Sequence, residues 1–298
     1  MEENLKKKKR NNIIITSLGV IASIAIGGIG GYFIAIELSP KGFDYSKLNQ
    51  NEYEDDVVSI YSNYLSNPLD PLSYSPNDIV NIALYKYSLE TYTESDVNAS
   101  AVSLGVTQKT FGKSIKNNNQ FFNESISQSS FVKVAKRFYE DENTVSIYNG
   151  EINNDNEGVS GNYKDKNDYT IDEYIDTWGK DLSRPVIYNI SSKTTLDTSF
   201  INKTDNGYLV SLDLDPITSV IRYVKQMVQM SSLDTAPQFE NVHIEFSLDN
   251  ELNLVEMNVQ ESYYVWVVGK NFTEATLNEK FYILEETNIP EFNEKIYY

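Results

Sequence analysis

Residues 238–248 read QFENVHIEFSL, and apolar and polar side chains alternate along this stretch. In a β-strand, alternation puts Val242, Ile244 and Phe246 on one face and His243 on the other. Three further stretches of strand character follow along the chain: 252–261, 262–268 and 276–284. Strands with a single apolar face are typical of an antiparallel sheet that covers a core on one side and meets water on the other.

The same pattern occurs nearer the N-terminus. Between Val97 and Gly150 short alternating segments predict a meander of antiparallel strands. A second run of strands is predicted at 185–194, 196–203 and 207–214. The polar segment between Gly150 and Tyr169 shows no apolar period and is predicted to be a surface loop.

Helix signals separate these runs of strands. Apolar residues at helical spacing predict a helix over 51–65, and Ser75-Pro76 marks the start of another that runs to about Glu90. Thr170 and Glu173 have capping-box spacing and open a short helix that ends near Trp178-Gly179. After Asp215-Pro216 an apolar stripe predicts the clearest helix: Ile217, Val220, Ile221, Val224, Met227 and Val228.

This order of elements predicts an α+β fold with a mainly antiparallel, curved sheet packed against three or four helices. Residues 39–74 then form a linker and first helix, and 75–298 form the α+β domain. Two architectures fit: one large sheet, or two tandem helix-plus-sheet units at 75–150 and 185–285. The single sheet is favoured because the strands at 185–214 fit the tandem arrangement poorly.

The N-terminus predicts a membrane anchor. Residues 13–38 read IIITSLGVIASIAIGGIGGYFIAIEL, directly after the basic run 6–10. As a helix, 13–36 would extend about 36 Å, more than the roughly 30 Å of a bilayer's hydrocarbon core. By the positive-inside rule, residues 1–12 form a cytoplasmic tail and the acidic remainder lies outside the cell. The predicted location is therefore the plasma membrane, with a single pass.

A cleaved signal peptide is the alternative for this segment. Cleavage after Ala25 or Gly27 would leave an exposed apolar stub as far as Ile36, so an uncleaved anchor is the preferred interpretation. Small residues recur at every fourth position of the anchor: Gly19, Ser23, Gly27 and Gly31. This spacing favours homo- or hetero-association with another helix in the lipid bilayer.

Composition excludes several classes of function. The formal net charge of −18 argues against nucleic-acid binding. Cysteine is absent and His243 is the single histidine, which removes thiolate metal sites, cysteine nucleophiles and histidine triads. The acidic stretch 155–168 lacks the spacing of a calcium loop. We therefore predict no catalytic residues, no cofactor and no metal.

An apolar ligand is the remaining candidate for a small-molecule site. Tyrosine is abundant, with 22 residues, and aromatic residues gather near the end of the chain. The predicted apolar groove comprises Tyr223, Met227, Tyr264 and Trp266.

Five features follow one another along the chain: the segment YLVSLDLDP at 208–216, a helix containing Tyr223, the residue Phe239, the strand 242–246 and the segment ESYY at 261–264. Together they resemble the half-barrel of the lipoprotein-carrier superfamily of the LolA and LppX type, over about residues 75–285. The resemblance implies an apolar or lipid ligand held between sheet and helices, without catalysis. A fixed anchor departs from that family and argues against shuttling between membranes.

Three hypotheses about function follow. The first is a non-enzymatic, single-pass extracytoplasmic protein of the bacterial cell envelope that binds an apolar ligand or a protein partner. The second is a structural subunit of an envelope, secretion or conjugation assembly. The third is a carboxylate-dependent cell-wall hydrolase, because acidic residues are plentiful although nothing singles out a pair.

Overall fold

The computed structural model describes residues 44–130, 133–231, 236–266 and 270–298. The predicted tail 1–12, the predicted anchor 13–38 and its residues Gly19, Ser23, Gly27 and Gly31 lie outside the described residues. Within the described residues, no helix combines the length and the apolar character needed to cross a bilayer.

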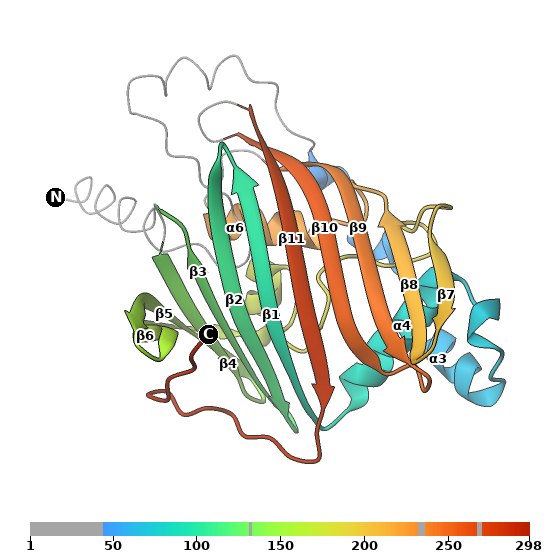
Figure 1. Ribbon diagram of the computed structural model, residues 1–298, viewed down its shortest axis with the longest axis horizontal. Helices are drawn as coiled ribbons and strands as arrows, with labels where there is room; N and C mark the ends of the chain where they lie inside the picture. Colours follow the sequence, from blue (N-terminus) through green and yellow to red (C-terminus); the bar gives the residue numbers. More distant parts are fainter. Residues whose placement is uncertain (1–43, 131–132, 232–235, 267–269) are drawn as a thin grey trace.

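The strands of the described residues all belong to one antiparallel sheet (Figure 1). The strands are β1 (Tyr92–Ser103), β2 (Val106–Asn117), β3 (Gln120–Gln128), β4 (Lys133–Glu140), β5 (Thr144–Asp155), β6 (Gly158–Thr170), β7 (Phe200–Thr204), β8 (Gly207–Leu214), β9 (Gln238–Asp249), β10 (Leu254–Trp266) and β11 (Lys270–Ile283). Their order is β6-β5-β4-β3-β2-β1-β11-β10-β9-β8-β7. Each meander is built from sequence neighbours, and the pairing of β1 with β11 joins the two into a single sheet.

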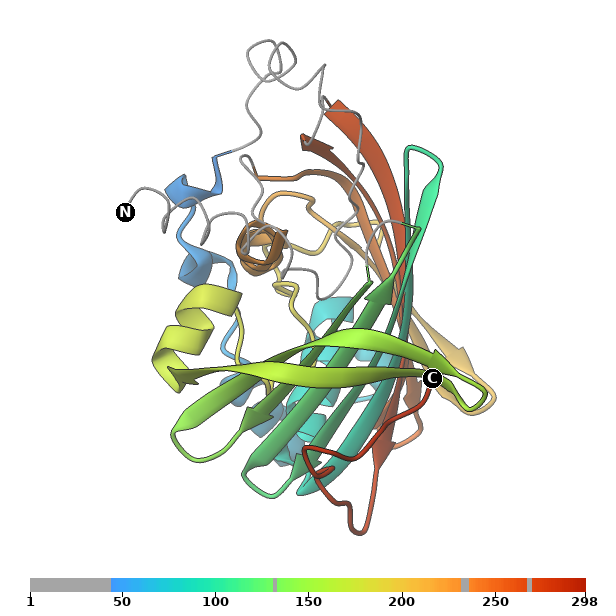
Figure 2. The same ribbon diagram turned by 90° about the vertical axis from the view of Figure 1, so that its left-hand side faces the viewer.

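The sheet is strongly curved, and the helices lie on its concave side (Figure 2). The described residues contain four α-helices: α3 (Val57–Ser66), α4 (Pro76–Leu89), α5 (Ile171–Trp178) and α6 (Ile221–Ser231). Short 3-10 turns occur at η1 (Tyr45–Lys47), η2 (Gln50–Tyr53) and η3 (Pro71–Ser73). The main core fills the space between helices α3, α4 and α6 and strands β1 and β8–β11, and α5 packs in a separate cluster against β4 and β5. The predicted α+β class, with a curved antiparallel sheet and about four helices, is confirmed.

Local capping explains where the helices begin. Ser75 accepts a hydrogen bond from the Asp78 amide, with Pro76 in the first helical position. Thr170 and Glu173 form the predicted capping box, and Gly179 ends α5 in the left-handed conformation. The helix predicted from residue 51 begins only at Val57, because Asp56 caps it by accepting from the Ser59 amide.

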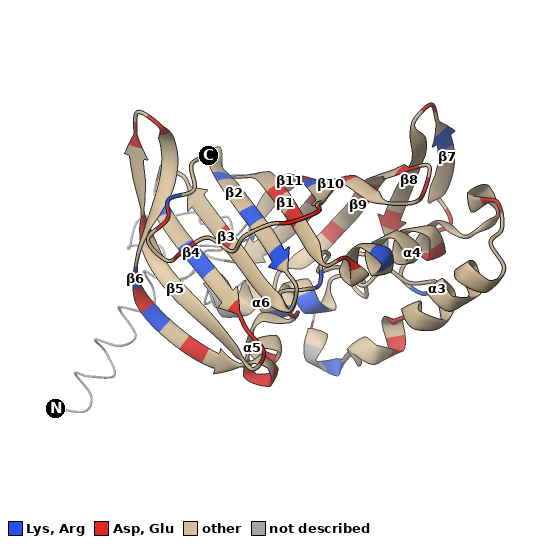
Figure 3. Cartoon of the chain, turned by 90° about the horizontal axis from the view of Figure 1, so that it is seen from below, with Lys and Arg blue, Asp and Glu red and all other residues tan. Residues whose placement is uncertain are grey.

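The prediction of a surface loop between Gly150 and Tyr169 is wrong. These residues form the end of β5 and all of β6, joined by a tight turn. Lysine and acidic residues follow one another along β6 (Figure 3), which is an edge strand exposed over much of its length. Charged edge strands resist pairing with other chains. Because β6 buries little apolar surface, its sequence lacks the alternation of apolar and polar residues that is used to predict strands.

Other strand boundaries also differ from prediction. Residues 185–194 form no strand, because this segment crosses the core and bonds to loops: the Asn189 amide donates to the Ser219 carbonyl at 2.8 Å. Of the predicted strand 196–203, only residues 200–203 pair in the sheet, as part of β7. Residues 254–261 and 262–266, which were predicted to belong to two strands, form one long strand, β10. The helix expected from Pro216 is regular only from Ile221.

The outer face of β3 and β4 is covered by the C-terminal segment. Buried Arg137 on β4 pairs with Glu124 on β3. Its other nitrogens donate to the carbonyls of Phe292, at 3.0 Å, and Glu294, at 2.6 Å. Because an unpaired buried charge is costly, these bonds hold the segment after β11 against the sheet.

Candidate functional site

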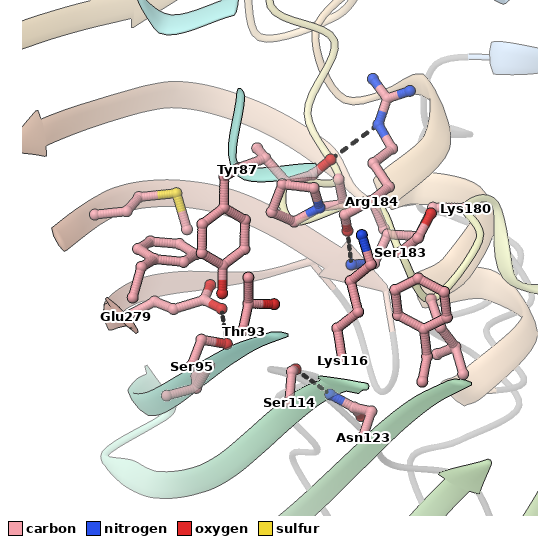
Figure 4. Close-up of a pocket in the computed structure, with 18 of the residues that line it drawn as sticks. Tyr87, Thr93, Ser95, Ser114, Lys116, Asn123, Lys180, Ser183, Arg184 and Glu279 are labelled. Atoms are coloured by element: carbon pink, nitrogen blue, oxygen red, sulfur yellow. Dashed lines mark hydrogen bonds between the residues drawn. The ribbon is translucent and has the colours of Figure 1, made fainter. Parts of the chain in front are cut away.

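A cavity of about 170 Å³ lies between the concave face of the sheet and the segment that follows α5 (Figure 4). An apolar cavity of about 150 Å³ is large enough to hold benzene, so this space has room for a ring or a short acyl segment. Aromatic and aliphatic side chains form most of its wall: Tyr87, Val97, Ile115, Phe121, Phe138, Tyr174, Val186, Met257, Val259, Leu277 and Phe281.

A buried carboxyl group occupies one side of the cavity. Glu279 projects from β11, and the Ser95 hydroxyl of β1 donates to it at 2.7 Å. Burial raises the pKa of Glu279 to about 7, although the nearby positive charge of Lys180 acts in the opposite direction. Near neutral pH this group therefore exists in both protonation states.

Three cationic side chains lie on the other side of the cavity in Figure 4. Lys116 donates to the Ser88 carbonyl at 2.7 Å, and Lys180 donates to the Arg184 carbonyl at 2.6 Å. Arg184 donates from Nε to the Val186 carbonyl at 3.0 Å. None of the three is within ion-pairing distance of a carboxylate among the described residues.

Burial disfavours the charged form of all three cations. It lowers the pKa of Lys116 and of Lys180. For Arg184, burial and then the charge of Arg222 lower the pKa to about 10. The hydrogen bonds of these three side chains go to backbone carbonyls and leave further N–H donors unused. A negatively charged group in the cavity could accept from these donors.

One buried hydroxyl in the cavity wall has no partner. Ser125 is 5% exposed, and its Oγ makes no hydrogen bond to any described residue. Buried polar atoms in native proteins are nearly always hydrogen-bonded. Ser125 therefore offers a free donor and acceptor to a molecule in the cavity.

A second buried acid supports the wall from behind. Glu261 on β10 accepts hydrogen bonds from Tyr188 at 2.6 Å and from Tyr223 at 3.0 Å, and both tyrosines border the cavity. Burial raises the pKa of Glu261 to about 7, and the two donated bonds oppose this rise. The network fixes two aromatic rings of the wall to the sheet.

The predicted apolar groove does not form as one site. Tyr223 lines the cavity, and Met227, one turn further along α6, is buried in the core. Tyr264 and Trp266 lie on the outer face of the sheet, because side chains alternate along β10 and Tyr263 takes the core side. Tyr264 and Trp266 are therefore removed from the cavity.

Sequence reasoning missed the polar groups of the cavity. The position of Glu279 could have been predicted from the sequence. Leu277 and Phe281 lie two residues before and two residues after it, so all three side chains share one face of the strand. Lys180 and Arg184 lie in an irregular segment, where no period indicates which side chains point inward.

The other chemical candidates lie elsewhere. His243 is on the face opposite the core, as predicted, with Nδ1 2.7 Å from Oδ1 of Asp213. Asp55 and Asp56, at the start of α3, bond to Ser192 and Ser59 and thereby connect or cap elements. Among the described residues, no three His, Cys, Asp or Glu side chains gather as a metal site would require.

Comparison with known proteins gives no family. No family model matches the chain, and no curated protein matches it. A protein called ywiB from Bacillus subtilis matches with a TM-score of 0.20 and 11% identity, over 64% of this chain and 92% of its own. A porin-like protein from Bacteroides uniformis matches with a TM-score of 0.23 and 9% identity, over 65% of this chain and 98% of its own.

A protein of the DUF1329 family from Desulfovibrio piger matches with a TM-score of 0.21 and 10% identity, over 72% of this chain and 94% of its own. At such low similarity these matches carry no argument about function.

Proposed function

We propose that this protein is a single-pass, membrane-anchored extracytoplasmic binding protein whose cavity holds an amphiphilic ligand with a negatively charged group. The main observation behind this proposal is the cavity, which combines an aromatic wall with three cationic side chains, Lys116, Lys180 and Arg184. Apolar pockets with a few polar groups are typical of small-molecule sites. Membership of the lipoprotein-carrier superfamily is part of the proposal and is supported by the curved sheet that partly encloses the helices.

Binding rather than catalysis also belongs to the proposal. The single histidine lies on the opposite face of the sheet from the cavity and pairs with Asp213. Anchoring is inferred from the apolar run 13–36 and the basic residues before it.

The test is displacement of the neutral fluorophore naphthalene from the full chain in detergent micelles by hexanoic acid or 1-hexanol, which are short enough for this cavity. We expect the acid to displace more strongly than the alcohol. The Ser125→Phe variant, which fills the cavity, should lose fluorophore binding. The matched Ser146→Phe variant, on the outer face of β5, should keep it.

A second variant keeps the proposal testable if Ser125→Phe fails to fold. Lys180→Met removes one cation without filling the cavity, and we expect it to weaken the preference for acid over alcohol. Equal displacement by the two amphiphiles, or full binding by Ser125→Phe, would overturn the proposed ligand class.

A further inference from the structure

One end of the sheet carries apolar side chains from two adjacent hairpins, some of them exposed and the others half-buried. Val102 lies near the end of β1 and Leu104 in the turn that follows it, and the others come from β10 and β11: Tyr264, Trp266 and Phe272. We name these five residues the apolar edge. The hairpins are neighbours, because Ser103 pairs with Thr273 and its hydroxyl donates to the Phe272 carbonyl.

Leu104 is the most unusual member of the apolar edge. It has a φ of 51° in the turn between β1 and β2, where Gly105 follows with a φ of 75°. Turns with two positive φ values favour asparagine and glycine, and the next hairpin accordingly uses Asn118 with a φ of 55°. At Leu104, however, an apolar side chain stands 63% exposed at the tip. Neither backbone preference nor solubility in water favours leucine here, which indicates an apolar partner.

The remaining members have the chemistry of a membrane interface. Tyr264 and Phe272 pair with ring centroids 5.3 Å apart, and Lys270 lies 3.8 Å above the Tyr264 ring. Aromatic rings with a nearby lysine are enriched where proteins meet lipid headgroups. Exposed Glu274, the cross-strand partner of Val102, offsets the charge of Lys270. This balance fits a zwitterionic surface better than an anionic one.

The described chain begins at the same end of the sheet. Tyr45 in η1 reaches the backbone of Phe239, and Phe239 pairs with Tyr263, directly before Tyr264. Figure 1 shows the start of the described chain, in blue, near the upper ends of β9 and β10, and Figure 2 shows that it lies on the concave side of the sheet. Asp44, where the described chain begins, therefore lies at the same end of the sheet as the apolar edge.

The length of the connecting segment limits how far this end can lie from the predicted anchor. Only residues 37–43 separate the apolar run 13–36 from Asp44. Seven residues span at most about 25 Å when fully extended. If 13–36 crosses the bilayer, the apolar edge is held close to the lipid surface.

We propose that the apolar edge lies against a zwitterionic lipid bilayer, with Leu104 and the aromatic rings in the headgroup region. This inference rests on the anchor of the proposed function. It does not depend on the cavity, because the cavity is lined by the first half of β1, at Thr93–Val97, and the apolar edge lies at its far end.

Trp266 provides the test, since the chain has only two tryptophans. The full chain with Trp178→Phe is reconstituted into phosphatidylcholine vesicles with or without brominated acyl chains. We expect the bromine atoms to quench most of the Trp266 emission. The reciprocal variant, Trp266→Phe, reports buried Trp178 of α5 and should show no quenching. The unmodified chain should show partial quenching, which tests the inference even if Trp178→Phe folds poorly.

A matched pair of substitutions controls the assignment. Leu104→Asp should reduce the quenching of Trp266. Leu89→Asp should leave it unchanged, because Leu89 is also exposed (56%) but precedes the opposite end of β1. Equal Trp266 emission in both lipids, from a chain that resists alkaline extraction from the vesicles, overturns this inference and leaves the anchor standing. A chain that alkaline buffer releases overturns the anchor and this inference together.

Discussion

At the scale of single residues, the concave side of the sheet contains carboxyl groups in unusual surroundings. Glu261 and Glu279 are each less than a tenth exposed, and burial raises the pKa of both to about 7. Tyrosine or serine hydroxyls bond to each of them. These hydrogen bonds limit the penalty of burying a carboxyl group in the core.

The raised pKa values predict how stability depends on pH. Between about pH 4.5 and 7 the folded chain binds protons at Glu261 and Glu279 that the unfolded chain has released. Each group therefore lowers the free energy of unfolding as pH rises, with a slope of up to about 1.4 kcal/mol per pH unit. Glu261→Gln should remove one such contribution, and urea unfolding from pH 5 to 7 measures it. Glu279→Gln should have the same effect. If neither variant changes the slope of the unfolding free energy against pH, the raised pKa values are refuted.

At the scale of elements, α5 is fixed between two signals that the sequence contains. The capping box starts it, and Gly179 ends it with a φ of 83°. Tyr174 of this helix lines the cavity, and Trp178 packs edge-on against Phe138 of β4. The ends of α5 thus determine where one wall of the cavity stands.

Gly179→Ala should destabilise the protein more than Gly105→Ala. Both glycines have a positive φ, which costs an alanine about 1 kcal/mol. A Cβ at Gly179 would also stand 2.6 Å from the Arg222 carbonyl of α6, whereas one at Gly105 would meet no atom within 4 Å. Denaturant unfolding should show an additional loss of about 1 kcal/mol or more at Gly179. Equal losses of unfolding free energy in the two variants would mean that α5 and α6 can move apart without an energetic penalty.

At the scale of the whole molecule, one long-range pairing unites the two meanders. β1 and β11 align from Thr93 with Ile283 to Ser103 with Thr273. Neighbouring strands of each meander need only short turns, but this central pair brings together segments from opposite ends of the described chain. The curved sheet can enclose the helices and the cavity only when this pair has formed.

The proposed anchor predicts the behaviour of the whole chain in cells. The full chain should remain with membranes in plain and alkaline buffer and dissolve only in detergent. A variant lacking residues 13–36 should not. Protease added outside intact cells should digest the acidic domain, with a known surface protein as control. A chain that washes free of membranes would contradict the predicted placement.

The sequence alone determined the local elements: the meander within 97–150, the Thr170–Glu173 capping box and the alternating strand at 238–248. Alternation and capping are short-range signals, so they can be read from neighbouring residues. Only the tertiary structure decided that β1 pairs with β11, that β6 is an edge strand, and that Tyr264 and Trp266 face away from the cavity. It also brought Lys180, Arg184 and Ser125 together around the cavity. These contacts join residues far apart in the chain, and their free energy comes from burial that no local pattern encodes.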